Sequence, residues 1–134
     1  RNLESGGIEA LSAFGIDIES LLRQVGNRVG EELSFSLRNI EGNIEYLSEM
    51  MDWWEFAGLG QLSYDIDPEF HILVEHPSDK PGVLPIHSLD DGIIEGALLT
   101  RYPEESGVVV TRNILEDKKN TVRYDINFNS QLLE

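Results

Sequence analysis

The residues of this chain whose types are suited to chemistry are three histidines and two pairs of neighbouring carboxylates. His71 and His76 fall in one predicted strand, where alternation puts them on opposite faces, so a shared metal ion would require a bulge. His71 and Glu75 share a face, but two ligands fall short of the three or four that a zinc site needs. His87 stands near the start of a predicted helix and is an isolated candidate for haem ligation. A surface or loop position is the simpler interpretation of each histidine.

The carboxylate pairs are Asp65 with Asp67 and Asp90 with Asp91. Acid–base catalysis by two carboxyl groups requires surroundings that separate their pKa values. These pairs fall at a strand end and in the first turn of a helix, where aspartate favours turn formation and the helix dipole. We therefore predict a structural role for both pairs. With no cysteine, no G-x-S-x-G elbow and no glycine-rich phosphate loop, we predict no catalytic residue, no metal site and no cofactor.

Length and hydropathy restrict the class of protein. A chain of 134 residues with 40% hydrophobic and 26% charged residues has the size and composition of one globular domain. No apolar run approaches the roughly 20 residues needed to cross a bilayer. The first residues lack the apolar segment of a secretory signal. The first residue is not Met, which suggests that the chain was cut from a longer protein or that its first residues were not retained. We expect a cytoplasmic protein without membrane insertion.

The charge is strongly acidic, with 25 Asp and Glu against 10 Lys and Arg and a net charge of −15. Such a charge repels nucleic-acid backbones and anionic membranes, so we expect no direct nucleic-acid binding. Three explanations stay open. The carboxylates form a solvated surface, or they are an adaptation to a salt-rich cytoplasm, or they meet a basic partner.

Two helices are predicted in the first half of a single domain over residues 16–130, after a lead-in or short helix over residues 1–15. Asp17 is a suitable N-cap for a long helix. Its apolar residues recur every three or four positions: Ile18, Leu21, Leu22, Val25, Val29, Leu33, Leu37 and Ile40. Gly26 and Gly30 weaken this helix by about 1 kcal/mol each, but they lie one turn apart and allow another element to approach closely. A further helix is predicted over residues 41–57.

The second half contains two predicted hairpins and a helix. Leu62, Tyr64 and Ile66 alternate with polar residues, and residues 70–75 return as a strand. Residues 76–85 hold three prolines and are predicted as a loop, followed by a helix over residues 86–101. Strands over residues 107–115 and 121–128 form the last hairpin. The order helix, helix, hairpin, helix, hairpin predicts an α+β fold, with the helices packed on one face of an antiparallel sheet.

The run Asp90-Asp91-Gly92-Ile93-Ile94-Glu95-Gly96-Ala97-Leu98-Leu99, followed by Gly107-Val108-Val109-Val110 and Val122-Arg123-Tyr124-Asp125-Ile126, resembles the 4-vinyl-reductase domain. That family belongs to a wider group with the small subunits of the TRAPP vesicle-tethering complex and the haem nitric-oxide-binding sensors. The resemblance covers residues 16–129. It implies a small-molecule-binding module, often attached to transcription regulators and frequently dimeric. The cysteine pair common in the family would fall at Ile114 and Val122, so a thiol- or metal-dependent role does not carry over.

Two functions are therefore predicted as alternatives. The first is a non-enzymatic, regulatory sensor that holds a small apolar ligand between the helices and the sheet, with Met50, Trp53, Trp54, Phe70, Ile94, Leu98 and Tyr124 as the pocket wall. Neighbouring tryptophans on a helix point about 100° apart, so one of the two packs inside. The second is an assembly module with a filled interior. In either case we expect a homodimer, with an interface formed by Leu22, Val25, Gly26, Val29 and Gly30.

Overall fold

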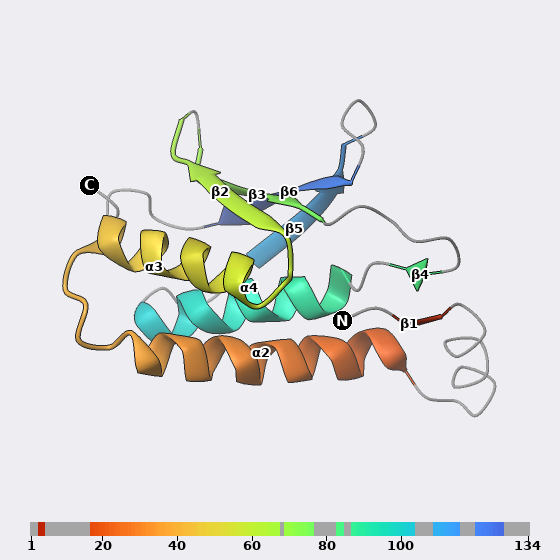
Figure 1. The fold of residues 1–134 in the computed structure, drawn as a ribbon, viewed down its shortest axis with the longest axis horizontal. Helices are drawn as coiled ribbons and strands as arrows, with labels where there is room; N and C mark the ends of the chain where they lie inside the picture. The colour runs from red at the N-terminus through yellow and green to blue at the C-terminus, as the bar shows by residue number, and fades with distance from the viewer. Residues whose placement is uncertain are drawn as a thin grey trace.

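The computed structural model describes residues 3–4, 17–67, 69–76, 83–84, 87–103, 109–115 and 120–127. In chain order, its elements are β1 (Leu3–Glu4), α2 (Ile18–Ser36), α3 (Asn43–Phe56), β2 (Gln61–Asp65), β3 (His71–Glu75), β4 (Val83–Leu84), α4 (His87–Arg101), β5 (Val109–Ile114) and β6 (Thr121–Asn127), as shown in Figure 1. The helices and the two hairpins follow the predicted order, and the α+β fold is confirmed. Most of the predicted lead-in and the end of the last predicted strand lie outside the described residues.

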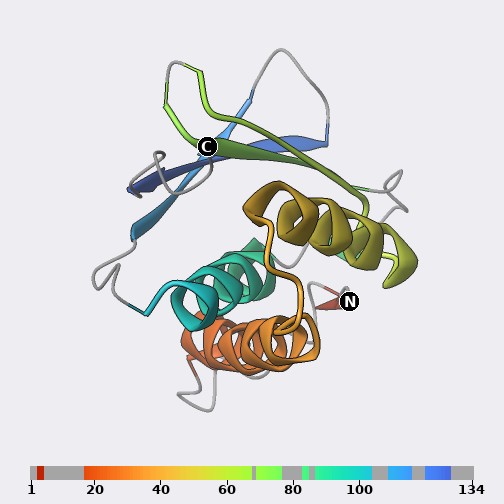
Figure 2. The same cartoon turned by 90° about the vertical axis from the view of Figure 1, so that its left-hand side faces the viewer.

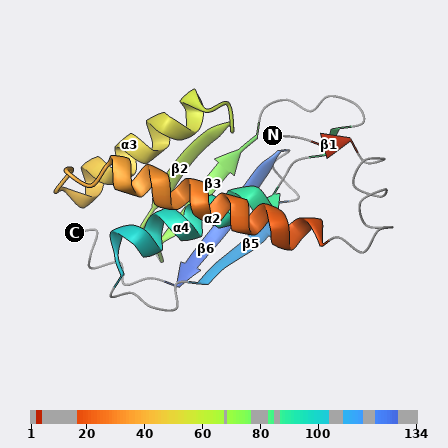
Figure 3. The same cartoon turned by 90° about the horizontal axis from the view of Figure 1, so that it is seen from below.

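The main sheet has four antiparallel strands in the order β2-β3-β6-β5. The two hairpins are joined side by side because β3 pairs with β6, with Ile72 opposite Tyr124. Alternation along β6 puts Val122, Tyr124 and Ile126 on the buried face. In Figure 2, α3 and α4 lie against one face of this sheet, and α2 lies below α4 on the side away from the sheet. Figure 3, from below, shows α2 in front of α4.

The prediction that residues 76–85 form only a loop was wrong. Val83–Leu84 forms strand β4, which pairs with β1 in a separate two-stranded sheet, Leu3 opposite Leu84. Two residues are too few to produce an alternating pattern, and the partner strand β1 lies near the N-terminus, far from β4 in the sequence. Neither the pairing nor the strand therefore has a local signal.

Helix α2 begins where its sequence predicted. The Asp17 side chain accepts a hydrogen bond from the backbone N–H of Ser20 at 3.1 Å, the usual arrangement of an N-cap. The helix ends at Ser36, so Leu37 and Ile40 lie beyond it in the connection to α3, although both still pack against the core. Helix α3 ends before Gly58 and Gly60, which adopt φ values of 78° and 114° that favour glycine.

Glycines on α2 and α4 form a close helix crossing. A Cβ atom added to Gly26 would lie 2.9 Å from the Gly92 Cα, and one added to Gly30 would lie 2.6 Å from the Ala97 nitrogen. Gly96 meets the backbone of Asn27 in the same way. The predicted close approach of another element is confirmed, and that element is α4 of the same chain.

This crossing determines the orientation of α2. Two of the apolar positions that recur along the helix, Leu21 and Val25, are 49% and 46% exposed. The face that turns inward is instead the one with the glycines, because two helices whose backbones touch have room only for small side chains. The apolar stripe is thereby rotated partly into solvent.

Candidate functional site

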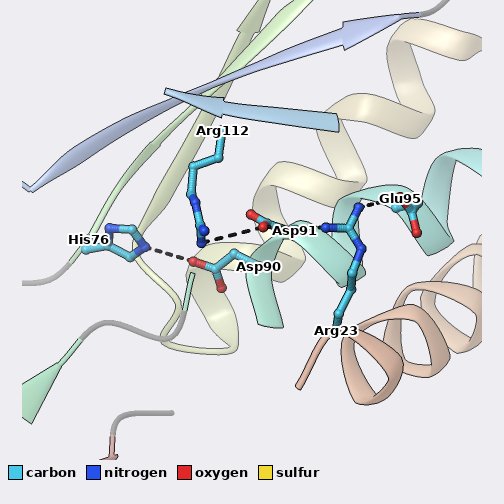
Figure 4. Close-up of polar contacts among 6 residues, drawn as sticks. All are labelled: Arg23, His76, Asp90, Asp91, Glu95 and Arg112. Atoms are coloured by element: carbon cyan, nitrogen blue, oxygen red, sulfur yellow. Dashed lines mark hydrogen bonds and ion pairs between the residues drawn. The ribbon is translucent and has the colours of Figure 1, made fainter. Parts of the chain in front are cut away.

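A cluster of charged side chains lies where the N-terminus of α4 meets α2 and the sheet (Figure 4). Its members come from four parts of the chain: Arg23 on α2, His76 directly after β3, Asp90, Asp91 and Glu95 on α4, and Arg112 on β5. The cluster therefore connects the helix layers to the sheet.

The centre of this cluster is a buried pair of His76 and Asp90. His76 Nε2 lies 2.8 Å from Asp90 Oδ2, and the two side chains are 4% and 0% exposed. The backbone N–H of His76 donates to the carbonyl of Asn120 at 2.8 Å, which fixes the residue at the end of β3. The ring of His87 lies 5.1 Å from that of His76, so two imidazoles and a carboxylate meet at the start of α4.

Asp91 is the second buried carboxylate and lies between two arginines. Its Oδ2 is 3.7 Å from Arg23 Nη1 and 3.5 Å from Arg112 Nη1. Arg23 also donates from Nη2 to Glu95 at 2.6 Å, so one guanidinium of α2 engages two carboxylates of α4. Burial raises the pKa of Asp91 above its ordinary value, although Arg112 and Arg23 act in the opposite direction. The pKa of the Tyr124 hydroxyl is raised by its burial and by the charges of Asp90 and Asp91.

The raised pKa of Asp91 gives stability a definite dependence on pH. The folded protein holds the Asp91 proton at pH values where the unfolded chain, with its ordinary pKa of 3.8, has lost it. This contribution is therefore fully present below the unfolded pKa and is lost as pH rises through the higher folded pKa. In Asp91→Asn, we expect urea unfolding to show a smaller loss of stability from acid to neutral pH. At neutral pH, the free energy of unfolding of Asp91→Asn should be at least as large as that of the parent.

The matched control for this experiment is Asp52→Asn, an exposed carboxylate on α3, which should leave the pH profile unchanged. Asp52→Asn leaves Asp91 and its surroundings unchanged. The charged and titratable groups around Asp91 are Arg23, Arg112, Asp90 and Tyr124. An Asp91→Asn profile that coincides with the parent profile would contradict the assignment.

The structure corrects what the sequence predicted for this cluster. Asp65 and Asp67 do form an exposed turn, in which the Asp67 N–H donates to Asp65 Oδ1 at 3.1 Å. Asp90 lies in the first turn of α4, as predicted, but both Asp90 and Asp91 are buried among charged partners. His71 and His76 are also buried, where a surface or loop position was predicted. The His71 Nδ1 lies 2.9 Å from the carbonyl oxygen of Glu69.

The residues of the predicted pocket wall belong to one cluster: six are in the buried core and Trp53 packs against it. Trp53 is half-buried beside Trp54, with ring centroids 6.4 Å apart, which agrees with one tryptophan inside and one nearer the surface. The other six residues are fully buried members of the core: Met50, Trp54, Phe70, Ile94, Leu98 and Tyr124. Side chains without exposed surface adjoin no space that a water molecule could enter. In this conformation, the predicted wall is therefore a packed core.

One polar atom in the described part of this core, the indole Nε1 of Trp54, lacks a hydrogen bond. The hydroxyl of Tyr124, by contrast, lies beside the carboxylate of Asp91. An unpaired buried donor costs about 1–3 kcal/mol, so such atoms are uncommon in a core. Among the described residues, no three metal-ligating side chains converge on one point.

The predicted dimer residues are divided between two faces of α2. Gly26 and Gly30 contact α4 of their own chain, so the structure removes them from any surface open to a second copy. Val29 packs partly against the core and Leu22 is half-buried. Val25 remains exposed, together with two residues that were not predicted for the interface, Leu21 and Phe35.

The exposed side of α2 carries both apolar and charged residues. Phe35 is 60% exposed, and between Val25 and Phe35 stand Arg28 and Glu32, whose side chains are 75% and 65% exposed and 3.4 Å apart. A surface pocket of about 360 Å³ adjoins this side, lined by Glu31, Glu32, Phe35 and Thr100. We call the five residues Leu21, Val25, Arg28, Glu32 and Phe35 the outer stripe of α2.

Comparison with known proteins gives no family for this chain. No family model matches it, and no curated protein matches it. The resemblance to 4-vinyl-reductase domains therefore stays a prediction. None of the helices in the described part of the chain has both the length and the apolar character required to cross a bilayer.

Proposed function

We propose that this protein is a non-enzymatic assembly module that forms a homodimer through the outer stripe of α2. The observation that carries this proposal is the exposure of Leu21, Val25 and Phe35 on a helix whose opposite side is already packed on α4. Single exposed apolar residues are ordinary, but three of them share one side of this helix, with the charged pair Arg28 and Glu32 between Val25 and Phe35. The proposed interface therefore keeps Val25 from the predicted one, adds Leu21 and Phe35, and no longer includes the glycines.

The energetics of this surface are compatible with association. Full burial of a leucine, valine or phenylalanine side chain contributes about 1.5–3 kcal/mol relative to exposure. The three apolar residues of the outer stripe, Leu21, Val25 and Phe35, are each about half exposed, and a two-fold dimer buries each of them twice, once in each copy. The resulting gain is comparable to the lower estimates of the entropy lost on association, about 4 kcal/mol. The expected dimer is therefore one that dissociates on dilution.

A sensor that binds a small apolar ligand is the second candidate, and one observation favours it. The unpaired Trp54 Nε1 lies among the apolar side chains of the core, and ligand sites combine apolar walls with a few polar groups of this kind. Because the same side chains adjoin no open space, this function requires the core to open. The homodimer requires no such change, which is why we prefer it.

Native mass spectrometry tests both functions on one sample. We expect a dimer of unmodified mass for the parent, and a shift to monomer for Val25→Glu, because a carboxylate placed in an apolar interface must be desolvated. The dissociation constant should rise by at least about tenfold, measured by sedimentation over a dilution series. Gln61→Glu is the control, since it adds the same charge at an exposed position on β2.

A parent protein that stays monomeric throughout the dilution series would overturn the dimer. An additional mass on the folded protein, released on denaturation as an apolar molecule, would instead establish the sensor.

A further inference from the structure

We infer that the two copies pair with their α2 helices antiparallel, so that Arg28 of each copy enters the surface pocket of the other. The pocket is the one lined by Glu31, Glu32, Phe35 and Thr100. This inference rests on the proposed homodimer and adds its register and the side chain that recognises the partner.

The first argument is the spacing of the outer stripe. Leu21, Val25, Arg28, Glu32 and Phe35 follow one another at alternating intervals of four and three residues. This is the spacing at which side chains form a single seam between two paired helices. The seam lies opposite the glycines that contact α4, so a second helix can reach it without disturbing the fold.

The second argument is the distribution of charge along this seam. The ends are apolar, and the middle holds one cation, Arg28, and one anion, Glu32. In a parallel pair, each residue would meet its own equivalent, so that arginine faces arginine and glutamate faces glutamate. In an antiparallel pair centred on position 30, Arg28 faces Glu32 of the second copy, and Val25 faces Phe35 of the second copy. By symmetry, each contact occurs twice. The antiparallel pair matches opposite charges while Val25 still meets an apolar residue, whereas the parallel pair sets like charges against each other.

The third argument is the chemistry of the pocket. Its two carboxylates lie beside the ring of Phe35, with Thr100 contributed by α4. A guanidinium is suited to such a site, because it pairs with carboxylates and stacks on aromatic rings. Within the chain, Arg38 already lies over the Phe35 ring at 4.2 Å. Arg28 is an extended, exposed side chain held by a single pair at 3.4 Å, which costs little to rearrange.

Charge exchange tests the pairing of Arg28 with the pocket. Arg28→Glu should weaken the dimer by at least about tenfold, because it sets a carboxylate against Glu31 and Glu32 of the second copy. Glu32→Arg should weaken it as well, and the double variant Arg28→Glu with Glu32→Arg should recover most of the affinity. Both positions are exposed on one helix, so the variants keep the fold, which circular dichroism verifies. A dimer that is indifferent to Arg28→Glu would overturn the assignment of the pocket.

Disulfide cross-linking tests the direction of the helices, since the chain contains no cysteine of its own. A mixture of Val25→Cys and Phe35→Cys should give a cross-linked heterodimer under mild oxidation, whereas Val25→Cys alone should not cross-link to itself. Self-cross-linking of Val25→Cys would show a parallel pair and would overturn this inference while leaving the homodimer intact. A parent protein that is monomeric would overturn both. The two failures are therefore distinguishable.

Discussion

Gly30→Ala is expected to lower the free energy of unfolding by about 2–3 kcal/mol, the range typical of overpacked cores. Alanine is the better helix former by about 1 kcal/mol, so propensity alone predicts the opposite sign. The loss arises because the added methyl group would meet the carbonyl of Ile93 and lie 2.6 Å from the nitrogen of Ala97. These are backbone atoms of α4, which cannot move aside without displacing the helix. Chemical denaturation followed by circular dichroism measures the change.

Gln24→Ala is the matched control, because it introduces the same residue on the same helix at an exposed position. It should change stability by no more than about 0.5 kcal/mol. If Gly30→Ala were as stable as this control, α2 and α4 would not be in backbone contact, and the placement of the outer stripe would fail with it.

Asp90→Ala is expected to cost about 3 kcal/mol or more of unfolding free energy. The side chain of Asp90 is fully buried and lies 2.8 Å from His76, so its removal leaves a buried imidazole without this partner. His76→Ala should cost a comparable amount. The double variant should be far less destabilised than the sum, since each single change already breaks the same pair. Additive effects would contradict the direct coupling of the two residues.

The comparison for this experiment is Asp65→Ala. That carboxylate accepts one hydrogen bond in an exposed turn, so its loss should have a small effect. The contrast between the two aspartates is informative because the sequence assigned both to the same structural role.

The three helices and the four strands of the main sheet could be predicted because each has a local cause. Asp17 begins α2 through its own side chain, and alternation along β6 follows from the pleat of a strand. The separation of Trp53 from Trp54 follows from the pitch of a helix. In each of these cases, the residues that determine the structure are neighbours in the chain.

The charged cluster could not be predicted because its members are distant in the sequence. Arg23, His76 and Arg112 meet Asp90 and Asp91 only after two helices and the sheet have packed. From the sequence alone, an aspartate that will be buried in a charged cluster cannot be distinguished from one that only interacts favourably with the helix dipole. The same limit applies to the packing of α2: the spacing of its glycines predicted a close approach, but nothing along the helix identifies α4 as the element that approaches.

The backbone contact between α2 and α4 has a consequence for how this protein could diverge. Side chains that interdigitate allow a helix to roll about its axis by changing rotamers, whereas touching backbones fix the angle at which α2 is held. The angle of α2 in turn fixes which of its residues point outward. Substitutions at Gly26, Gly30, Gly92 or Gly96 would then alter the surface that a partner meets, although none of these glycines is part of it. The four glycines therefore determine the orientation of α2, and with it which of its residues face solvent.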